Sequence, residues 1–425
     1  MTAESPAAPL TFREVLRLDV MRRLWYAQIV SLLGDFLALF AVISVVSFRM
    51  HGTPGQITGV QIAYMLPLTI LGPLSGVFVD RWPLKPTLIA SDVIRAGLAV
   101  LLMFSTSIPQ VYAVLLGLSS VSSFFLPAQS VTIRTHVPRE GLLSANALMQ
   151  LAMMGIRILG PASAGALVAA FGPNLCYQLD VVSFLASATL IGSVAIRRPE
   201  VQLKPDTTRG PDTTSVSPLR KLLHDMLEGL RFILHHPAVQ FVVLAMAASL
   251  FTAGCFGPLI AIYVRDWLHA SSAAFGMVSA GIGVGMFAGT PVVRSVARVA
   301  RNETMVLAGL AGIGGGALLL GLSTTVPLAF LATFAIGFAF AAVIVPAQTL
   351  LQQETPHEMM GRVSSSVTAV VFTAQVLGLV LSGGLADLLG VRLVFIACAG
   401  LGVGMAALGR LLLAGRSAAT ASSSA

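Results

Sequence analysis

Long apolar stretches alternate with short polar turns along the whole chain. A helix needs about 20 apolar residues to cross a lipid bilayer, and by this measure the pattern predicts twelve membrane-spanning α-helices. Their predicted ranges are 22–48, 57–79, 86–106, 109–131, 143–170, 174–196, 238–263, 273–293, 303–322, 326–349, 362–386 and 390–413. The apolar runs are continuous rather than alternating, which excludes a transmembrane β-barrel. The predicted fold class is an all-α integral membrane protein.

The polar segment 197–237 separates six predicted helices from the other six. Within it, Ser217 and Pro218 are typical of a helix N-cap and first helical residue, and leucines follow at helical spacing. We interpret this pattern as an amphipathic helix on the inner membrane surface; packing under the bundle is the alternative. The predicted organisation is a six-helix half at 1–196, a cytoplasmic linker with this amphipathic helix at 197–237, a second six-helix half at 238–413 and a disordered cytoplasmic tail at 414–425.

The two halves repeat each other in sequence. The motif Leu126-Pro127-Ala128-Gln129 recurs as Val345-Pro346-Ala347-Gln348. Further on, glycines recur at one constant offset, and the matched pairs are Gly160 with Gly378, Gly165 with Gly383 and Gly172 with Gly390. Two pseudo-symmetric six-helix halves are typical of transporters, in which the substrate path runs between the halves.

Composition and charge support this interpretation and exclude other classes of protein. Hydrophobic residues make up 56% of the 425 residues and charged residues only 10%, which excludes an ordinary soluble enzyme or a disordered chain. Of the 26 Lys and Arg residues, 21 fall in the tails and loops of one side, three on the other side and two within spans. The positive-inside rule therefore predicts that both termini and the linker are cytoplasmic. The net charge of +8 follows from this topology, so we expect no nucleic-acid partner.

A pattern of glycine and charged residues marks the turn after the second predicted span. Its residues are Gly76, Asp80, Arg81 and Lys85. The Asp80 carboxylate is suited to face the positive N-terminal end of the eleventh span, near Gly361 and Arg362. We interpret this as a gate contact whose making and breaking favours inward- or outward-open states. The alternative is that the charges only mark the membrane edge.

This turn and several other motifs resemble the major facilitator superfamily. The motifs include Ser31-Leu32-Leu33-Gly34-Asp35, Asp92 with Arg95, Pro127-Ala128-Gln129, Pro138-Arg139-Glu140, Gly160-Pro161 and Glu228-Gly229-Leu230-Arg231-Phe232. They resemble in particular the subfamily that contains the enterobactin exporter, macrolide efflux proteins and the lysophospholipid transporter. The resemblance implies a bacterial inner-membrane protein that exports a substrate, often in exchange for protons.

Charged residues inside the predicted spans are the strongest functional candidates, because a charge in the bilayer is costly. Asp35 lies near the middle of the first span and Arg157 near the middle of the fifth. We predict that they face a central cavity at one depth and couple protons to substrate; a permanent structural pair is the alternative. Asp92 and Arg95 are three residues apart on one helical face, which predicts a structural ion pair. For Asp180, near the outer end of the sixth span, we expect a structural or gating role.

Polar residues on other helical faces complete the candidate site. The predicted lining of the substrate cavity comprises Gln28, Ser31, Gln61, Tyr64, Asn146, Gln150, Thr368 and Gln375. A loose match to the antiporter motif of proton-coupled exporters comprises Gly155, Gly160, Pro161 and Gly165. Glycine lets helices approach closely and proline bends them, so this motif adds modest support for export.

The sequence contains no catalytic constellation and no phosphate-binding loop, so we expect neither an enzyme nor an ATP-driven pump. We also expect no cofactor or metal, with the proton gradient as the energy source. The predicted function is a secondary active transporter, an antiporter with alternating access. It would export a hydrophobic or amphipathic small molecule such as a drug, macrolide or siderophore, an efflux activity of the kind that gives antibiotic resistance. The alternative is a lysophospholipid carrier of the same fold without proton coupling. The expected partners are the small amphipathic substrate and the lipid bilayer, and we expect a monomer.

Overall fold

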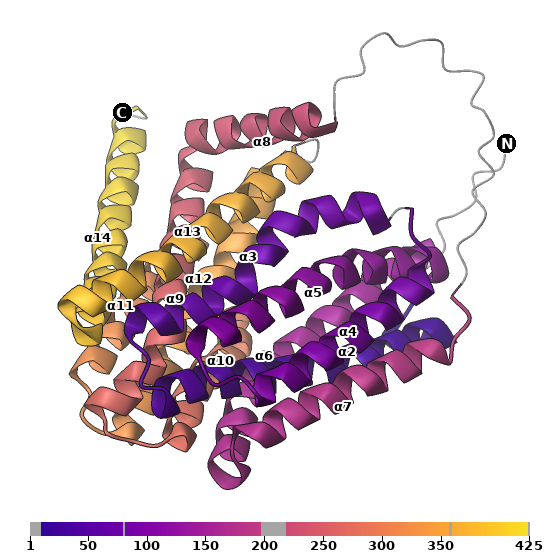
Figure 1. The fold of residues 1–425 in the computed structure, drawn as a ribbon. Coiled ribbons are helices and arrows are strands. Elements are labelled where there is room, and N and C mark those ends of the chain that lie inside the picture. Colours follow the sequence, from indigo (N-terminus) through magenta and orange to yellow (C-terminus); the bar gives the residue numbers. More distant parts are fainter. Residues whose placement is uncertain (1–9, 80, 197–217, 357–358, 424–425) are drawn as a thin grey trace, which may run out of the picture. The chain divides into compact units, whose positions relative to one another are not determined.

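The computed structural model describes residues 10–79, 81–196, 218–356 and 359–423, and these residues form helices joined by short turns, without a strand (Figure 1). Twelve of the described helices have 20 or more residues. They are α2 (Asp19–Ser44), α3 (Pro54–Val79), α4 (Leu84–Met103), α5 (Ile108–His136), α6 (Leu142–Phe171), α7 (Pro173–Gly192), α9 (Pro237–Ile262), α10 (Ser272–Val296), α11 (Asn302–Leu322), α12 (Val326–Glu354), α13 (Met360–Leu389) and α14 (Val391–Ser423). Two shorter α-helices, α1 (Phe12–Arg17) and α8 (Pro218–His235), precede α2 and α9.

Ten of the long helices in the described part are long and apolar enough to cross a membrane. The other two, α3 and α6, contain 26 and 30 residues. The described helices are therefore consistent with twelve spans, and an all-α membrane fold is confirmed. Only helices and closed barrels satisfy their backbone hydrogen bonds within lipid.

The C-terminal end differs from the sequence prediction. Helix α14 continues to Ser423, whereas we predicted a disordered tail from residue 414, so that prediction is wrong for residues 414–423. Four of the ten residues from 414 to 423 are alanines, and alanine is the strongest helix former. The predicted N-cap Ser217 and the linker residues 197–217 lie outside the described residues.

The helices form two compact units. The first contains α1 to α7 and residues Ser271–Met277 at the start of α10. The second contains α8, α9, the rest of α10, and α11 to α14. In the first unit, α2 packs against α6 and α7, and α4 packs against α5 and α7. These contacts bring the middles of α2, α4 and α7 together.

The internal repeat extends to the start of every long helix. Each of α9 to α14 begins at the same offset from its counterpart among α2 to α7, and this offset is also the one that relates the repeated glycines. Pro237, for example, matches Asp19, and Val391 matches Pro173. The motif at Pro127 departs from this register, because its counterpart Pro346 lies one position later within a helix of the same length.

Unusual backbone features repeat at the same offset. Helices α2 and α9 each end in one turn of π-helix, η1 (Val45–Arg49) and η3 (Tyr263–Trp267). Shortly after each of these turns the chain takes a left-handed conformation, at His51 (φ 50°) and His269 (φ 48°), which is uncommon for a residue with a side chain. Gly172 and Gly390 end α6 and α13 with φ of 81° and 84°. The shared details show that both units use one helical framework.

Candidate functional site

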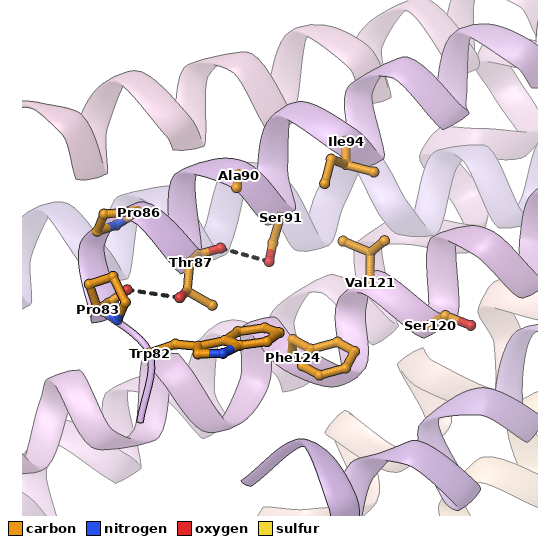
Figure 2. A pocket seen from close by; sticks show the side chains of 10 residues that line it. All are labelled: Trp82, Pro83, Pro86, Thr87, Ala90, Ser91, Ile94, Ser120, Val121 and Phe124. Carbon is orange, nitrogen blue, oxygen red and sulfur yellow. Dashed lines mark hydrogen bonds between the residues drawn. The ribbon is translucent and has the colours of Figure 1, made fainter. Parts of the chain in front are cut away.

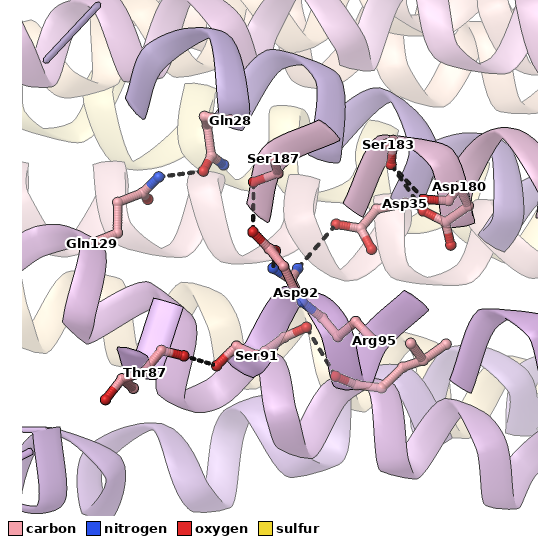
Figure 3. Close-up of polar contacts among 12 residues, drawn as sticks. Gln28, Asp35, Thr87, Ser91, Asp92, Arg95, Gln129, Asp180, Ser183 and Ser187 are labelled. Atoms are coloured by element: carbon pink, nitrogen blue, oxygen red, sulfur yellow. Dashed lines mark hydrogen bonds and ion pairs between the residues drawn. The ribbon is translucent and has the colours of Figure 1, made fainter. Parts of the chain in front are cut away.

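A buried ion pair lies on α4, in the first unit (Figure 3). Arg95 donates a hydrogen bond to the Asp92 carboxylate, and both side chains are buried. The other carboxylate oxygen of Asp92 accepts a hydrogen bond from the Ser187 hydroxyl of α7 at 2.7 Å. The structure thus contains the contact that the spacing of Asp92 and Arg95 predicts. Its structural role stays a prediction.

Two aromatic rings hold the Arg95 guanidinium from other directions. Its central carbon lies 4.5 Å from the ring centre of Phe125 on α5 and 4.4 Å from that of Phe184 on α7. Such cation–π contacts stabilise a desolvated guanidinium. The Nε donor of Arg95 is buried and has no hydrogen-bond partner within the described residues. Arg95 therefore keeps one unused donor next to the acidic side chains.

Asp35 of α2 is the second carboxylate near Arg95. Its Oδ2 atom lies 3.8 Å from Nη1 of Arg95, and 21% of its side chain is exposed. This distance permits electrostatic attraction but is too long for a hydrogen bond. Arg95 therefore binds Asp92 firmly and Asp35 loosely.

Asp180 of α7 is the third carboxylate and has 1% relative exposure. The Ser183 hydroxyl donates to the Asp180 main-chain carbonyl at 2.7 Å and lies 3.5 Å from its Oδ1 atom. Both side chains lie against Gly34 of α2, the residue directly before Asp35, where any Cβ would overlap them. The absence of a side chain at Gly34 thus leaves the space in which Asp180 lies next to Asp35 (Figure 3).

The sequence did not reveal this arrangement in full. We predicted Arg157 as the partner of Asp35, and the Arg157 side chain lies outside the described residues, so that pairing stays a prediction. The cation that the structure places near Asp35 is Arg95. Asp180 was assigned no part in coupling. The sequence does contain one sign of the cluster. All four charged residues, Asp35, Asp92, Arg95 and Asp180, lie within apolar segments of the first six-helix half.

The residues predicted to line the substrate cavity differ in solvent exposure. Gln28 is buried and accepts a hydrogen bond from the side-chain amide of Gln129 on α5, and Ser31 is buried one turn further along α2. The partly exposed members are Gln61, Tyr64 and Gln375. The exposed members are Asn146, Gln150 and Thr368. Their role as a substrate lining stays a prediction.

The gate motif is only partly described, because Asp80 lies outside the described residues. Lys85 donates a hydrogen bond to the carbonyl of Gly192 at the end of α7 at 2.7 Å. Arg362, at the start of α13, donates to the Glu228 carboxylate of α8 at 2.8 Å. The contact between Asp80 and the start of α13 stays a prediction. The link between Arg362 and Glu228 is one that sequence reasoning missed.

The antiporter-like glycines lie on α6. Gly160 packs against the ring of Phe36 on α2, and a Cβ there would overlap the ring. At Gly155 the space around a Cβ is open among the described atoms. Gly160 therefore allows the close approach that we predicted, whereas Gly155 does not need it. The side chain of Pro161 lies outside the described residues.

An apolar cavity of about 390 Å³ lies between the start of α4 and the middle of α5 (Figure 2). The stacked rings of Trp82 and Phe124, with centres 5.5 Å apart, line it together with Thr87 and Ile94. None of the predicted substrate-lining residues lines this cavity. It is separate from the charged cluster, and its lining offers no charged group.

The sequence matches the family model of the transmembrane secretion effectors over residues 5–425. The chain belongs to this family of major facilitator transporters. This membership confirms the predicted resemblance, and it agrees with a transporter rather than an enzyme.

Individual relatives of this family member are transporters too. It is 27% identical to the uncharacterised transporter YfiS of Bacillus subtilis over 378 residues. This alignment covers 88% of this chain and 88% of YfiS. It is 23% identical over 379 residues to macrolide efflux protein A of Streptococcus pyogenes, covering 87% of this chain and 90% of the relative. It is 26% identical over 371 residues to the enterobactin exporter EntS of Citrobacter koseri, covering 82% of this chain and 84% of the relative.

A solved structure shows the same fold. It is that of a bacterial homologue of the human lysosomal transporter Spinster, in an inward-facing and unoccupied conformation. The TM-score is 0.67 with 13% sequence identity, over 96% of this chain and 97% of the homologue. At this identity the likeness concerns the fold alone.

Proposed function

We propose that this transporter exports a hydrophobic or amphipathic small molecule, such as a macrolide or a siderophore, in exchange for protons. The relatives named for macrolide efflux and enterobactin export support the substrate class. In an antiporter with alternating access, protons and substrate bind the same states in turn, so that the downhill flow of one drives the other. The proton gradient is then the energy source, and no cofactor takes part.

The observation that carries this proposal is the loose hold on Asp35. Its carboxylate is partly exposed in the middle of α2, 3.8 Å from an Arg95 side chain that already binds Asp92. Protonation of Asp35 removes one of the two negative charges that attract Arg95. Arg95 is then held by Asp92 alone, and Asp35 no longer attracts a substrate group that is cationic or donates hydrogen bonds. Protonation and substrate binding at Asp35 therefore oppose each other, so binding of substrate favours release of the proton.

The setting that we propose is the bacterial plasma membrane, with both termini in the cytoplasm and the protein acting as a monomer. The bacterial relatives and the apolar helices support the membrane. The distribution of Lys and Arg supports the orientation.

The test uses proteoliposomes with an imposed pH gradient and an internal pH dye. A macrolide, a catecholate siderophore and a lysophospholipid are added in turn to the wild type, to Asp35→Asn and to Asp266→Asn. Asp266 is a matched control, because its carboxylate is 53% exposed and belongs to the second unit. We expect substrate-triggered proton flux that is lost in Asp35→Asn and kept in Asp266→Asn. Lysophospholipid transport without proton flux, unchanged in Asp35→Asn, would refute the antiport and favour the lipid carrier.

A further inference from the structure

The buried cluster of the first unit contains more acid than base. Among the described side chains it comprises the three carboxylates Asp35, Asp92 and Asp180 and the single cation Arg95. Counting Arg157 of the packed helix α6 as well would still leave three acids against two bases. An ionised carboxylate without a cation is very costly inside a membrane protein. This excess of acid favours the protonated form of at least one of these carboxyls.

Asp180 is the carboxyl with the weakest support for a charge. It forms no ion pair within the described residues, whereas Asp92 binds Arg95 and Ser187. The Ser183 hydroxyl is 3.5 Å from the carboxylate and closer to the main-chain carbonyl of Asp180. Asp180 is also almost fully buried, while Asp35 is partly exposed. A proton from solvent therefore meets Asp35 before Asp180.

The internal repeat shows that helix packing does not require these charges. In the register that relates the helix starts, the four charged residues match Ala253, Leu310, Ile313 and Cys398. Leu310, Ile313 and Cys398 are buried in the second unit. They lie on α11 and α14, which begin at the positions that match the starts of α4 and α7. The same framework is thus packed with apolar side chains in one unit and with a charged cluster in the other. This observation is independent of the contacts within the cluster, and it points to a function for the buried acids.

We propose that Asp180 is a second proton-binding carboxyl, which holds a proton at neutral pH and exchanges it with Asp35. In the exchange, the O–H bond of Asp180 breaks and an O–H bond forms at a carboxylate oxygen of Asp35, so that one acid is neutral and one ionised before and after. This inference rests on the proposed proton antiport and deepens it, because it gives the first unit an internal proton store behind Asp35. The other described groups that act electrostatically on the pair are Asp92 and Arg95 on α4 and Tyr64 on α3.

The first test is infrared spectroscopy of the full-length protein in phosphatidylethanolamine–phosphatidylglycerol vesicles at pH 7, without substrate. Protonated carboxyls absorb apart from ionised ones, and transfer into D₂O shifts their band as the proton exchanges. We expect a protonated-carboxyl band in the wild type that is lost in both Asp180→Asn and Asp180→Cys. The residue at the matching position of the second unit is the buried Cys398, so Asp180→Cys introduces a side chain that the repeated framework packs there. The control Asp266→Asn removes an exposed carboxylate and should leave the band unchanged.

The second test asks whether Asp35 is the route to Asp180. The variant is Asp35→Ala, because alanine is the residue at the matching position of α9. We expect its Asp180 band to remain. We expect the exchange of this band with D₂O to slow by about tenfold or more, equivalent to about 1.4 kcal/mol in activation free energy. Absence of the band in the wild type, or its persistence in both Asp180 variants, would overturn the proton store. Exchange unaffected by Asp35→Ala would overturn the route. Since no substrate is used, an intact Asp180 band combined with no substrate-driven proton flux would refute the proposed antiport alone.

Discussion

At the scale of single residues, Arg95 is the side chain that links the other members of the buried cluster. It is bound by Asp92, attracted by Asp35 and enclosed by the rings of Phe125 and Phe184. Sequence spacing predicts the contact with Asp92, because residues three apart share a helical face. The contact with Asp35 requires that α2 and α4 both pack against α7, which no local pattern reveals.

The first prediction concerns the stability of this pair. Arg95→Ile leaves Asp92 as an uncompensated buried charge, so we expect the free energy of unfolding to fall by about 3–5 kcal/mol. The double variant Asp92→Leu/Arg95→Ile carries the residue types found at the matching positions of the second unit, Leu310 and Ile313. We expect most of the lost stability to be recovered in this double variant. Unfolding by denaturant in detergent micelles, followed by tryptophan fluorescence, measures both. A double variant as unstable as the single one would show that the pair itself stabilises the first unit.

At the scale of elements, α8 packs against α13 within the second unit. Gly229 lies against the main chain of Arg362 and the hydroxyl of Ser366 on α13, and the Ser366 hydroxyl donates to the carbonyl of Met226 at 2.9 Å. The described part of α8 therefore takes the packed arrangement that we had considered as the alternative to a helix on the membrane surface. Leu227 remains 65% exposed on another face. Contact of that face with lipid stays a prediction.

The second prediction tests this packing. Gly229→Leu inserts a side chain where the α13 main chain approaches most closely, and overpacking of this kind costs about 1–3 kcal/mol. We expect α8 to detach, with faster hydrogen–deuterium exchange in peptides spanning residues 226–235 and little change in α12. Leu227→Ala is the control, because it truncates an exposed side chain of the same helix. Equal exchange in wild type and Gly229→Leu would contradict the close packing.

Helix α1 supplies a pH-dependent prediction. The main-chain N–H of Thr11 donates to the Glu14 carboxylate at 2.8 Å, and the Thr11 hydroxyl donates to it at 2.7 Å. These hydrogen bonds lower the pKa of Glu14. A carboxyl whose pKa is lower in the folded state stabilises it fully above the ordinary pKa, and this stabilisation is lost as the pH falls through the lowered value.

We therefore expect α1 to stay docked at neutral pH and to loosen only in acid, below the ordinary Glu pKa of about 4.3. Fluorescence anisotropy of a dye on Arg13→Cys would report this as a fall in anisotropy on acidification. Adding Glu14→Gln should remove this pH dependence, since no carboxylate is left to titrate. An acid transition that persists in Glu14→Gln would show that another group controls α1.

At the scale of the whole molecule, the two units are versions of one six-helix framework. Their common register includes the helix starts, the π-helical turns and the left-handed histidines. The charged cluster breaks this symmetry, since it occurs in the first unit and apolar residues occupy its matching positions in the second. The asymmetry assigns proton handling to the first unit within our proposal.

The membrane orientation gives a prediction at this scale. We expect Thr106, between α4 and α5, to face the outside and Arg298, between α10 and α11, to face the cytoplasm, following the positive-inside rule. Thr106→Cys should react with a membrane-impermeant maleimide in intact cells, and Arg298→Cys only after permeabilisation. The native cysteines Cys176, Cys255 and Cys398 are buried and give little background. The reverse pattern of labelling would invert the orientation.

The sequence by itself determined the helical membrane fold, the positions of the helices and the internal repeat. These follow from local properties: an apolar run long enough to span lipid must satisfy its backbone hydrogen bonds as a helix, and a duplicated sequence retains its register. It also identified Asp35 and the Asp92–Arg95 pair, because charges in apolar runs and a three-residue spacing are visible along the chain.

Only the tertiary structure decided which charges meet. Asp35, Arg95 and Asp180 belong to three helices, so their proximity depends on how α2, α4 and α7 rotate and pack. Gly34 shows the physical reason: the space left by one missing side chain allows α7 to bring Asp180 against α2. The docking of α8 on α13 depends in the same way on Gly229. A sequence shows where a glycine stands, but the partner that fills the space beside it is set by packing.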